Sequence, residues 1–385
     1  MQGDQRVGEC SVVVKVTRLC NLRCSYCHDW RDGAGQTMTF GVLARVIAGV
    51  LGDPEHDAVS FIWHGGEPSM VGLQFFRRAL VVQARFARSE QAVRNVLQTN
   101  GTRISAAWAR FLRDYEFSVG ISIDGPASLH DLRRVHRSGR GSFDEVLQGI
   151  RTLRDHGVPF GVLMVVDGAA LELGPDAVFD FMLEHGISSY GFNAVCPDNQ
   201  PRATPGTPAE PYVAPRAMGE FLAGIYDRWL THGDRGIRIR EIDGILARLR
   251  NDSASPCQLR GGCLGEYFIV EPDGDVAHCD LFLGDDSYRL GNVTTDTFSA
   301  LRAGPAMTAL RDQRRAELAA MAACPEFAVC NGWCPHETYL SRRHDPAHRP
   351  GCCGLDSLIG HIRATAPPPQ RASVLLPDPL VRSGS

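Results

Sequence analysis

Short apolar runs rich in β-branched residues alternate with segments of helical periodicity through the first half of the chain. This alternation is typical of βα units, which build a parallel sheet in an α/β fold. Six units favour a partial (β/α)6 barrel over the closed eight-stranded barrel. We expect the strands at residues 12–16, 59–63, 93–98, 118–123, 160–166 and 190–194.

Two of the expected helices carry clear end signals. Thr39 is placed to cap the first of them, and Ser142 and Glu145 have the spacing of a capping box for the second. Gly157 marks the end of that second helix. The buried stripe of the first helix is predicted to be Leu43, Val46, Ile47, Val50 and Leu51.

The second half of the chain differs in character from the first. A stretch rich in Pro, Ala and polar residues, at 196–215, predicts a long loop that lines a substrate cleft. Helices around 216–231 and 241–251 then lead into a cysteine-rich region. We therefore expect a barrel domain at 1–235, a cysteine-rich domain at 236–365 and a disordered tail at 366–385.

Charge and hydropathy exclude several classes of protein. The net charge of −4, with no sustained basic stripe, argues against nucleic acid as a partner. No apolar run is long enough to span a membrane, and no secretory signal is visible, so we expect a cytoplasmic protein. The densest basic run predicts a solvated loop for all its members except Arg134; they are Arg133, Arg134, Arg137 and Arg140.

The chain has thirteen cysteines. A reducing compartment argues against a disulfide framework, and the odd number of cysteines strengthens that objection. Three lie within eight residues, at Cys20, Cys24 and Cys27, and eight more lie between Cys257 and Cys353. We expect these to bind metal or iron–sulfur clusters. Cys10 and Cys196 stand apart and are expected to be small buried hydrophobic residues.

The N-terminal group has the sequence Cys20-Asn-Leu-Arg-Cys24-Ser-Tyr-Cys27 and directly follows the first expected strand. Structural zinc requires four ligands, and no fourth suitable ligand is nearby apart from His28. Three thiolates on a cubane cluster instead leave one iron open. That iron could chelate the amino and carboxylate groups of S-adenosylmethionine (SAM).

This motif resembles that of the radical SAM superfamily, and further segments extend the resemblance. HGGEP at 64–68 resembles the family segment that contacts the SAM amino group, and its glycines permit close approach of backbone. QTNG at 98–101 and SIDGP at 122–126 resemble strand ends that contact the ribose and methionine parts of SAM. The SAM-binding residues that the resemblance implies are Gly65, Gly66, Glu67, Pro68, Asn100, Ser122 and Arg134.

The second cysteine array resembles the SPASM extension of radical SAM enzymes that modify peptides and proteins. A hairpin turn at Asp273 and Gly274 is expected to bring Cys263 and Cys279 together. The resemblance implies a first auxiliary [4Fe-4S] cluster on Cys257, Cys263, Cys279 and Cys334, and a second on Cys324, Cys330 and Cys352.

The second auxiliary cluster departs from the family pattern. Met321 stands where a further cysteine is expected, so the fourth ligand is either Cys353 or absent. A structural zinc site in this array is the alternative, because thiolates alone do not identify their metal.

Asp280 follows Cys279 directly, and the segment resembles one in anaerobic sulfatase-maturing enzymes, where an aspartate is proposed to accept a proton. A carboxylate beside a cluster and a substrate cleft is suited to general-base catalysis. The alternative is a turn residue that binds backbone amides.

The resemblance implies reductive cleavage of SAM to a 5′-deoxyadenosyl radical, which abstracts a side-chain hydrogen from a substrate. We expect a ribosomally made peptide as substrate and an intrapeptide cross-link as product. The alternatives are an anaerobic sulfatase-maturing (formylglycine-generating) enzyme, a small-molecule dehydrogenase or epimerase, and a non-catalytic electron-transfer protein. Expected partners are a peptide or protein substrate and a flavodoxin- or ferredoxin-type electron donor. Because only about ten residues precede the first strand, any leader recognition is expected to use either a separate leader-peptide-recognition protein or the barrel surface.

Overall fold

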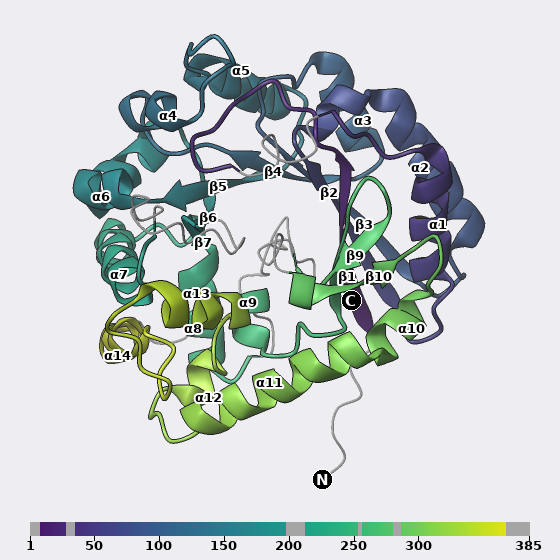
Figure 1. The fold of residues 1–385 in the computed structure, drawn as a ribbon. Coiled ribbons are helices and arrows are strands. Elements are labelled where there is room, and N and C mark those ends of the chain that lie inside the picture. The colour runs from purple at the N-terminus through teal and green to yellow at the C-terminus, as the bar shows by residue number, and fades with distance from the viewer. Residues whose placement is uncertain (1–7, 28–34, 198–211, 253–255, 280–285, 367–385) are drawn as a thin grey trace.

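A single mixed sheet organises the chain in the computed structural model, which describes residues 8–27, 35–197, 212–252, 256–279 and 286–366 (Figure 1). The order of its ten strands is β10-β9-β8-β1-β2-β3-β4-β5-β6-β7. The strands are β1 (Glu9–Thr17), β2 (Ala58–Gly65), β3 (Ala92–Thr99), β4 (Ser118–Ser122), β5 (Phe160–Val166), β6 (Ser189–Ala194), β7 (Arg238–Ile239), β8 (Tyr267–Val270), β9 (Asp275–Ala277) and β10 (Arg289–Asn292). The first six confirm the strands expected from the sequence.

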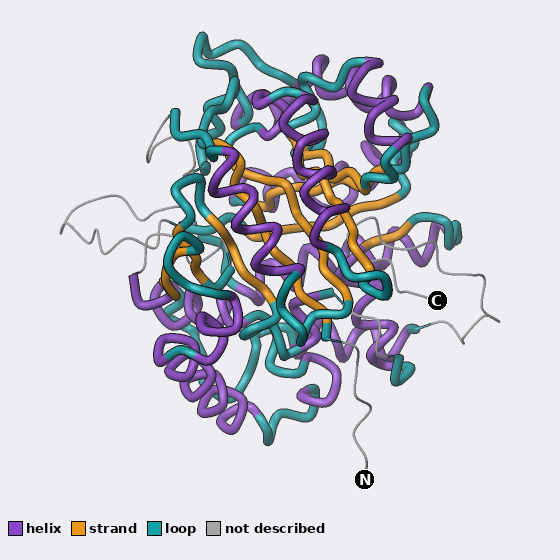
Figure 2. Tube along the Cα trace, turned by 90° about the vertical axis from the view of Figure 1, so that its right-hand side faces the viewer, coloured by secondary structure: helices purple, strands orange, loops and turns teal. Residues whose placement is uncertain are grey.

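Helices follow the strands of the first half and cover the outer face of the sheet, as Figures 1 and 2 show from two directions. They are α1 (Phe40–Leu51), α2 (Leu73–Phe86), α3 (Ala106–Asp114), α4 (Ala127–Arg133), α5 (Phe143–Asp155), α6 (Gly168–Glu184), α7 (Pro215–His232) and α8 (Arg240–Leu249). Strands β1 to β7 pair in parallel with their neighbours, so their carboxyl ends lie at one edge of the barrel. The predicted α/β partial barrel is confirmed.

The second half contributes a β-hairpin and short helices. Strand β8 pairs in parallel with β1, and β9 and β10 continue the sheet in antiparallel fashion. The long helix α11 runs across the bottom of Figure 1, between α12 and α10. The helices of this part are α9 (Cys257–Arg260), α10 (Phe298–Ala303), α11 (Pro305–Met321), α12 (Phe327–Cys330), α13 (Pro335–His344) and α14 (Asp356–Thr365).

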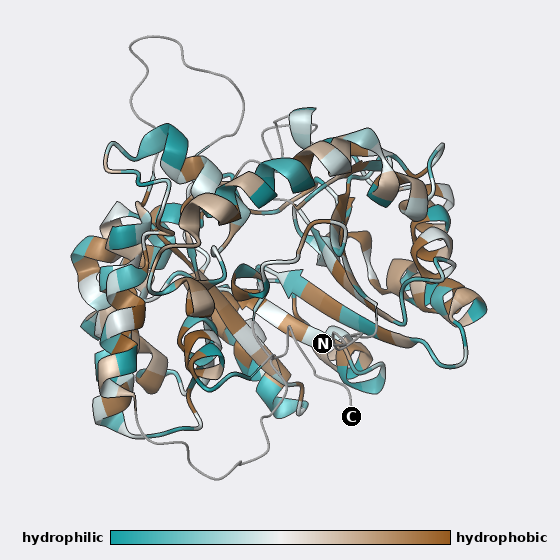
Figure 3. Cartoon of the chain, turned by 90° about the horizontal axis from the view of Figure 1, so that it is seen from below, coloured by the Kyte–Doolittle hydropathy of each residue, from teal (hydrophilic) through white to brown (hydrophobic). Residues whose placement is uncertain are grey.

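Alternation along the strands gives the sheet two different faces. In β1, Val12, Val14 and Val16 belong to the hydrophobic core, as do Phe61 and Trp63 in β2. Because successive side chains point to opposite faces, the residues between them face the inside of the barrel. Figure 3 shows the hydrophobic colouring concentrated on strands and on the inward sides of helices.

The ends of α1 and α5 show one correct and one wrong expectation. Thr39 caps α1 by accepting a hydrogen bond from the amide of Val42, and the buried stripe is the expected one. In α5, however, Ser142 makes no side-chain cap. The carboxylate of Asp131 instead accepts hydrogen bonds from the amides of Ser142 and Phe143, at 2.8 and 2.9 Å. The capping box was wrong because a residue outside the local sequence supplies the acceptor.

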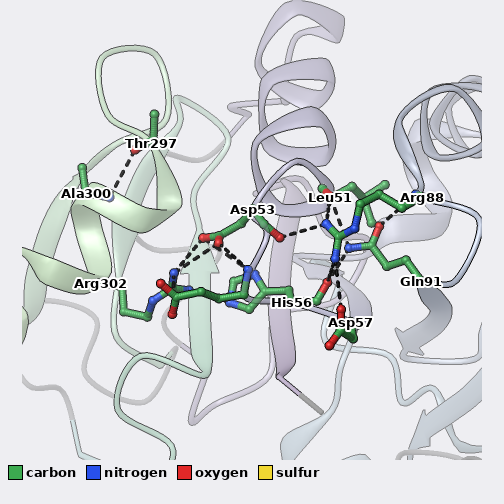
Figure 4. Close-up of polar contacts among 10 residues, drawn as sticks. Leu51, Asp53, His56, Asp57, Arg88, Gln91, Thr297, Ala300 and Arg302 are labelled. Carbon is green, nitrogen blue, oxygen red and sulfur yellow. Dashed lines mark hydrogen bonds and ion pairs between the residues drawn. The ribbon is translucent and has the colours of Figure 1, made fainter.

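A polar contact joins the two halves near the amino end of β2 (Figure 4). Arg302 of α10 donates to both carboxylate oxygens of Asp53, at 3.2 and 3.0 Å, and to Nε2 of His56 at 2.7 Å. Sheet and core also run through both halves, so no break in packing marks residue 235. The domain boundaries therefore stay predictions. Among the described residues, no helix is long and apolar enough to cross a membrane.

Candidate active site

The loop that carries the first three cysteines is fixed by a neighbouring backbone segment. It follows β1 and pairs with the chain just after α4. The amide of Arg23 donates to the carbonyl of Val135 at 2.7 Å, and the amide of Ser25 donates to the carbonyl of Arg133 at 2.9 Å. The loop is thus held at the carboxyl edge of the strands without regular secondary structure of its own.

Three thiols gather within this loop. Cys20 interacts electrostatically with Cys24 and Cys27, and burial raises the pKa of Cys20 to about 12. Burial also raises the pKa of Cys24, and the nearby Arg134 opposes that change only in part. Once deprotonated, these buried thiolates are poorly solvated by water, so a nearby positive charge is needed to stabilise them. The set therefore fits an iron–sulfur cluster, in which each thiolate binds a different iron, rather than a single metal ion.

The GGEP segment is locked to the ends of β1 and β3. Glu67 is fully buried. One of its oxygens accepts from the Ser69 amide and the Thr99 hydroxyl, at 2.9 and 2.8 Å, and the other accepts from the Asn100 amide at 2.8 Å. Its carboxylate is therefore a structural clamp between strands.

The glycines of this segment allow close approach, but to protein backbone. A Cβ built on Gly65 would lie 2.2 Å from the Thr17 carbonyl oxygen, and one on Gly66 would lie 2.3 Å from that of Leu19. Gly65 also has a φ of 116°, which favours glycine. The two glycines thus let the end of β2 pack directly against the cysteine loop, and Pro68 begins the short η1 (Pro68–Val71) after it.

Ser122 and Arg134 lie at the same edge of the sheet. The side-chain Nε2 of Gln98 donates to the Ser122 hydroxyl at 3.0 Å. Arg134 is buried, and one of its terminal nitrogens donates to the Tyr26 hydroxyl at 2.5 Å. Its Nε has no hydrogen-bond partner among the described residues. A buried guanidinium with a spare donor fits the carboxylate group of an amino-acid-like cofactor such as SAM.

Sequence reasoning missed three members of this site, which are Tyr26, Asp124 and Arg133. The Tyr26 hydroxyl donates to Asp124 at 2.7 Å, and Asp124 is fully buried. Arg133 lies 3.6 Å from the Asp124 carboxylate and 2.6 Å from that of Asp167. Arg133 was expected in a solvated loop, but it is only 3% exposed, because these two carboxylates compensate its charge. The missed signal was Asp124 itself, which looked like an ordinary turn residue.

Three cysteines of the first C-terminal group lie close to one another. Cys257, Cys263 and Cys334 interact electrostatically, and burial raises the pKa of Cys334 and of Cys263. The expected turn is confirmed: Gly274 has a φ of 94°, and its amide donates to the Glu271 carbonyl at 2.9 Å. Cys279 ends the hairpin and packs against the small core cluster of Tyr288, Leu310, Tyr339 and Leu340. Asp280 lies outside the described residues.

The second group brings four thiols together, including that of Cys353. Cys353 hydrogen-bonds to Cys330 and Cys352, and Cys324 interacts with both of those residues. The bond from Cys353 lowers the pKa of Cys352 to about 6, while the pKa of Cys353 rises. Met321 is buried at the end of α11. The described residues contain no group of three or more His, Cys, Asp or Glu side chains that could hold a single metal ion.

Of the two isolated cysteines, Cys10 is fully buried in β1 as expected. Cys196 is only partly buried and packs against the same small core cluster as Cys279.

Two families match this chain. Residues 14–172 match the radical SAM superfamily, and residues 262–326 match SPASM, an iron–sulfur cluster-binding domain. These domains bind SAM and [4Fe-4S] clusters. The first match contains the N-terminal cysteine loop, and the second contains Cys263, Cys279 and Cys324.

Relatives extend this similarity over most of the chain. A serine-type anaerobic sulfatase-maturating enzyme of Bacteroides thetaiotaomicron is 29% identical, over 91% of this chain and 89% of its own length. The serine-type enzyme of Klebsiella aerogenes is 30% identical, over 82% and 77%. The cysteine-type enzyme of Clostridium perfringens is 31% identical, over 73% and 76%.

Solved structures agree with these relatives. Native anSMEcpe with bound AdoMet superposes with a TM-score of 0.78 at 27% identity, over 92% of this chain and 97% of that one. Streptococcus suis SuiB bound to precursor peptide SuiA has a TM-score of 0.60 at 14% identity, over 86% and 73%, which is a likeness of fold alone. The chain is therefore a SPASM-containing radical SAM enzyme and belongs to the family of the anaerobic sulfatase-maturating enzymes.

Proposed function

We propose that this enzyme oxidises a serine or cysteine side chain of a sulfatase polypeptide to formylglycine. The observation that carries the proposal is similarity along nearly the whole chain, barrel and cysteine array together, to serine-type and cysteine-type sulfatase-maturating enzymes. The related anSMEcpe has also been solved with AdoMet and a peptide bound together, at the same TM-score of 0.78. A peptide substrate is accordingly the second part of the proposal.

The proposed cluster ligands combine the thiol groups described above with Cys279, which the SPASM resemblance assigns to the first auxiliary cluster. When bound, a [4Fe-4S] cluster supplies a reducing electron, and SAM supplies the group that takes up a hydrogen atom. Cys353 completes the second auxiliary set, since its thiol lies in contact with two of the other three. The ligand sets are Cys20, Cys24 and Cys27; Cys257, Cys263, Cys279 and Cys334; and Cys324, Cys330, Cys352 and Cys353.

The residues around the loop hold and orient the cofactor. Arg134 and Ser122 offer a guanidinium N–H and a hydroxyl at the carboxyl edge of the strands, where they bind its carboxylate and hydroxyl groups. Glu67 keeps the backbone of Gly65 and Gly66 in place for its amino group. Asp124 accepts a hydrogen bond from the Tyr26 hydroxyl, and the Arg133 guanidinium lies over the Tyr26 ring, so these two residues fix Tyr26 within the cysteine loop.

Oxidation of the substrate side chain removes a hydrogen atom from its carbon, one further electron, which the auxiliary clusters are proposed to accept, and a proton from the hydroxyl or thiol. With a cysteine substrate, the resulting thioaldehyde then takes up water and releases hydrogen sulfide. Asp280, placed next to a proposed ligand of the first auxiliary cluster, is proposed to accept the proton. An electron donor of flavodoxin or ferredoxin type and a separate leader-recognition protein stay predictions, as does a cytoplasmic location.

Peptide cross-linking is the competing function. It was the main expectation from the sequence. The family relationship supports sulfatase maturation, the stated alternative, better than it supports cross-linking. The cross-link stays a prediction. A small-molecule dehydrogenase or epimerase has no specific observation behind it.

The proposal is tested with paired peptides taken from a sulfatase that differ only in Ser, Cys or Ala at the modified position. The reconstituted enzyme is incubated anaerobically with SAM and dithionite, and products are identified by mass spectrometry. Formation of an aldehyde from the Ser or the Cys peptide, trapped with a hydrazine reagent, supports the proposal. The Ala peptide and Cys20→Ala enzyme serve as controls. Release of 5′-deoxyadenosine without any aldehyde from either peptide would contradict it.

A further inference from the structure

The side chain of Asn100 was expected to contact SAM, but the protein itself satisfies its amide. Its oxygen accepts from the backbone amide of Thr102 at 3.0 Å and from the Thr102 hydroxyl at 2.8 Å. Its nitrogen donates to the Asn21 amide oxygen at 3.0 Å and to Sγ of Cys20 at 3.8 Å. Each hydrogen-bonding position of the amide therefore has a partner.

The orientation of this amide is fixed by a donor that cannot be exchanged. The backbone N–H of Thr102 can only donate, so the atom of Asn100 that faces it must be the oxygen. The nitrogen then faces Asn21 and Cys20. Asn21 in turn donates its own amide to the Thr102 hydroxyl at 2.9 Å, which closes a ring of three side chains.

This ring joins two elements that meet at the carboxyl edge of the sheet. Asn100 and Thr102 follow β3, and Asn100 is only 5% exposed. Asn21 lies in the cysteine loop beside Cys20. The backbone of Asn100 is held as well, since its amide donates to Glu67. The donor that faces Cys20 is thus presented by the rigid end of a strand.

Cys20 receives a second hydrogen bond from its own loop. The amide of Leu22 donates to Sγ of Cys20 at 3.3 Å. Two N–H groups from different elements therefore point at one sulfur. Hydrogen bonds to ligand sulfurs are among the factors that set the reduction potential of iron–sulfur clusters. Donors stabilise the reduced state, because reduction places more negative charge on the cluster and its sulfurs.

We propose that Asn100 is a positioning residue for the catalytic cluster: its amide N–H orients the Cys20 thiolate and raises the reduction potential of the cluster bound there. The side chain does not bind SAM. This inference rests on the proposed ligand set of Cys20, Cys24 and Cys27, and it is independent of the sulfatase substrate. A higher reduction potential allows a cellular electron donor of less negative potential to reduce the cluster.

The test is an anaerobic redox titration of the reconstituted full-length enzyme, followed by electron paramagnetic resonance. The signal that changes on addition of SAM identifies the N-terminal cluster among the others. In Asn100→Ala, the ratio of reduced to oxidised cluster at a fixed potential should fall about tenfold, which corresponds to about 60 mV for a one-electron couple. SAM affinity, measured by equilibrium dialysis without a reductant, should change less than about threefold.

Two further variants keep the test decisive. Asn100→Asp retains an oxygen for Thr102 but replaces the N–H donor, so its potential should fall at least as far as that of Asn100→Ala. Thr102→Val tests the rest of the ring. It loses the hydroxyl that bonds to Asn100 and Asn21 but keeps the backbone N–H that orients Asn100, so its potential should fall less than that of Asn100→Ala.

Three outcomes are distinguishable. An unchanged potential together with a tenfold or larger loss of SAM affinity would overturn the inference and restore Asn100 as a SAM contact. Loss of about four irons from Asn100 variants that otherwise keep the fold would support the positioning role, since partners of metal ligands commonly contribute to metal affinity. If the wild type shows no signal that responds to SAM, the ligand set itself fails.

Discussion

The barrel site and the C-terminal cysteine array hold their thiols in different ways. Around the N-terminal loop, strand ends supply a dense set of hydrogen bonds, such as the three to Glu67 and the ring around Asn100. The array is built from the four-residue helices α9 and α12 and from turns. Three of its non-glycine residues have a left-handed backbone: Cys279, Asn331 and Trp333.

The difference indicates where the protein depends on its clusters. A left-handed backbone costs roughly 1–2 kcal/mol at residues other than Gly, Asn and Asp, so Cys279 and Trp333 keep it only where their surroundings enforce it. The barrel can form its site from packing of the sheet and helices. In the array, we expect the metal–thiolate bonds to supply much of the stabilisation.

The largest expected effect separates the two regions by function. The combined Cys20→Ala, Cys24→Ala and Cys27→Ala variant should release no 5′-deoxyadenosine above background, and its iron content should fall by about four from about twelve per chain. The combined Cys330→Ala and Cys353→Ala variant should still cleave SAM, because its catalytic loop is intact. Chromatography of 5′-deoxyadenosine and iron assay measure both. SAM cleavage that survives in the first variant would contradict the ligand set.

Iron removal should separate the two regions by stability. After chelation under anaerobic conditions, amide hydrogen exchange should accelerate in 257–279 and 324–353 by at least about a hundredfold, equivalent to about 3 kcal/mol of local stability. Strands β2 to β5 should keep their protection, since parallel neighbours flank each of them. Mass spectrometry of peptic fragments gives both regions in one experiment. Equal loss of protection in both would mean that the barrel also depends on metal.

Within the barrel, the clamp at Glu67 is the next test. Glu67→Gln removes the charge and turns an amide N–H₂ toward donors, so it should destabilise the protein by about 2–4 kcal/mol. Glu220→Gln is the matched control, because Glu220 is exposed and forms an ion pair with Arg216, a contact worth about 0.3–0.5 kcal/mol. Thermal unfolding of the reconstituted proteins measures both. Similar melting temperatures for the two variants would show that Glu67 is no clamp.

The sequence predicted the strands and the thiol-bearing segments because these depend on local patterns. Apolar runs are visible in the chain, and so is the close spacing of Cys20, Cys24 and Cys27. The α5 cap failed because Asp131, eleven residues before Ser142, supplies the acceptor. Arg133 was placed in solvent because its two carboxylate partners, Asp124 and Asp167, come from other elements of the fold.

Roles within the site were harder to predict than its location. QTNG at 98–101 was correctly placed at the carboxyl end of a strand, but the sequence does not show that Asn100 faces a cysteine rather than open space. The contribution of Cys353 was similarly open, because adjacent cysteines cannot be ranked as ligands by spacing. Both questions depend on distances between segments that are remote in the sequence.

The smallest expected effect concerns the contact between the halves in Figure 4. A guanidinium has only donors, so His56 accepts from Arg302 through Nε2 and is neutral in the folded protein. Burial lowers the pKa of His56, Arg302 lowers it further, and Asp53 and Glu55 oppose the change. Because the folded pKa lies below that of the unfolded chain, the unfolded state binds more protons, and stability falls as the pH drops below about 6.5.

His56→Gln keeps an oxygen acceptor for Arg302 but does not titrate, so the variant should lose less stability than the wild type between about pH 7.5 and about pH 5.5. Melting temperatures of the reconstituted proteins at the two pH values measure this difference, and the comparison cancels acid effects on the clusters that both proteins share. His232→Gln is the control, since His232 is exposed and lies far along the chain on α7. An acid response of His56→Gln equal to that of the wild type would mean that the stability of the contact between the halves does not depend on this proton.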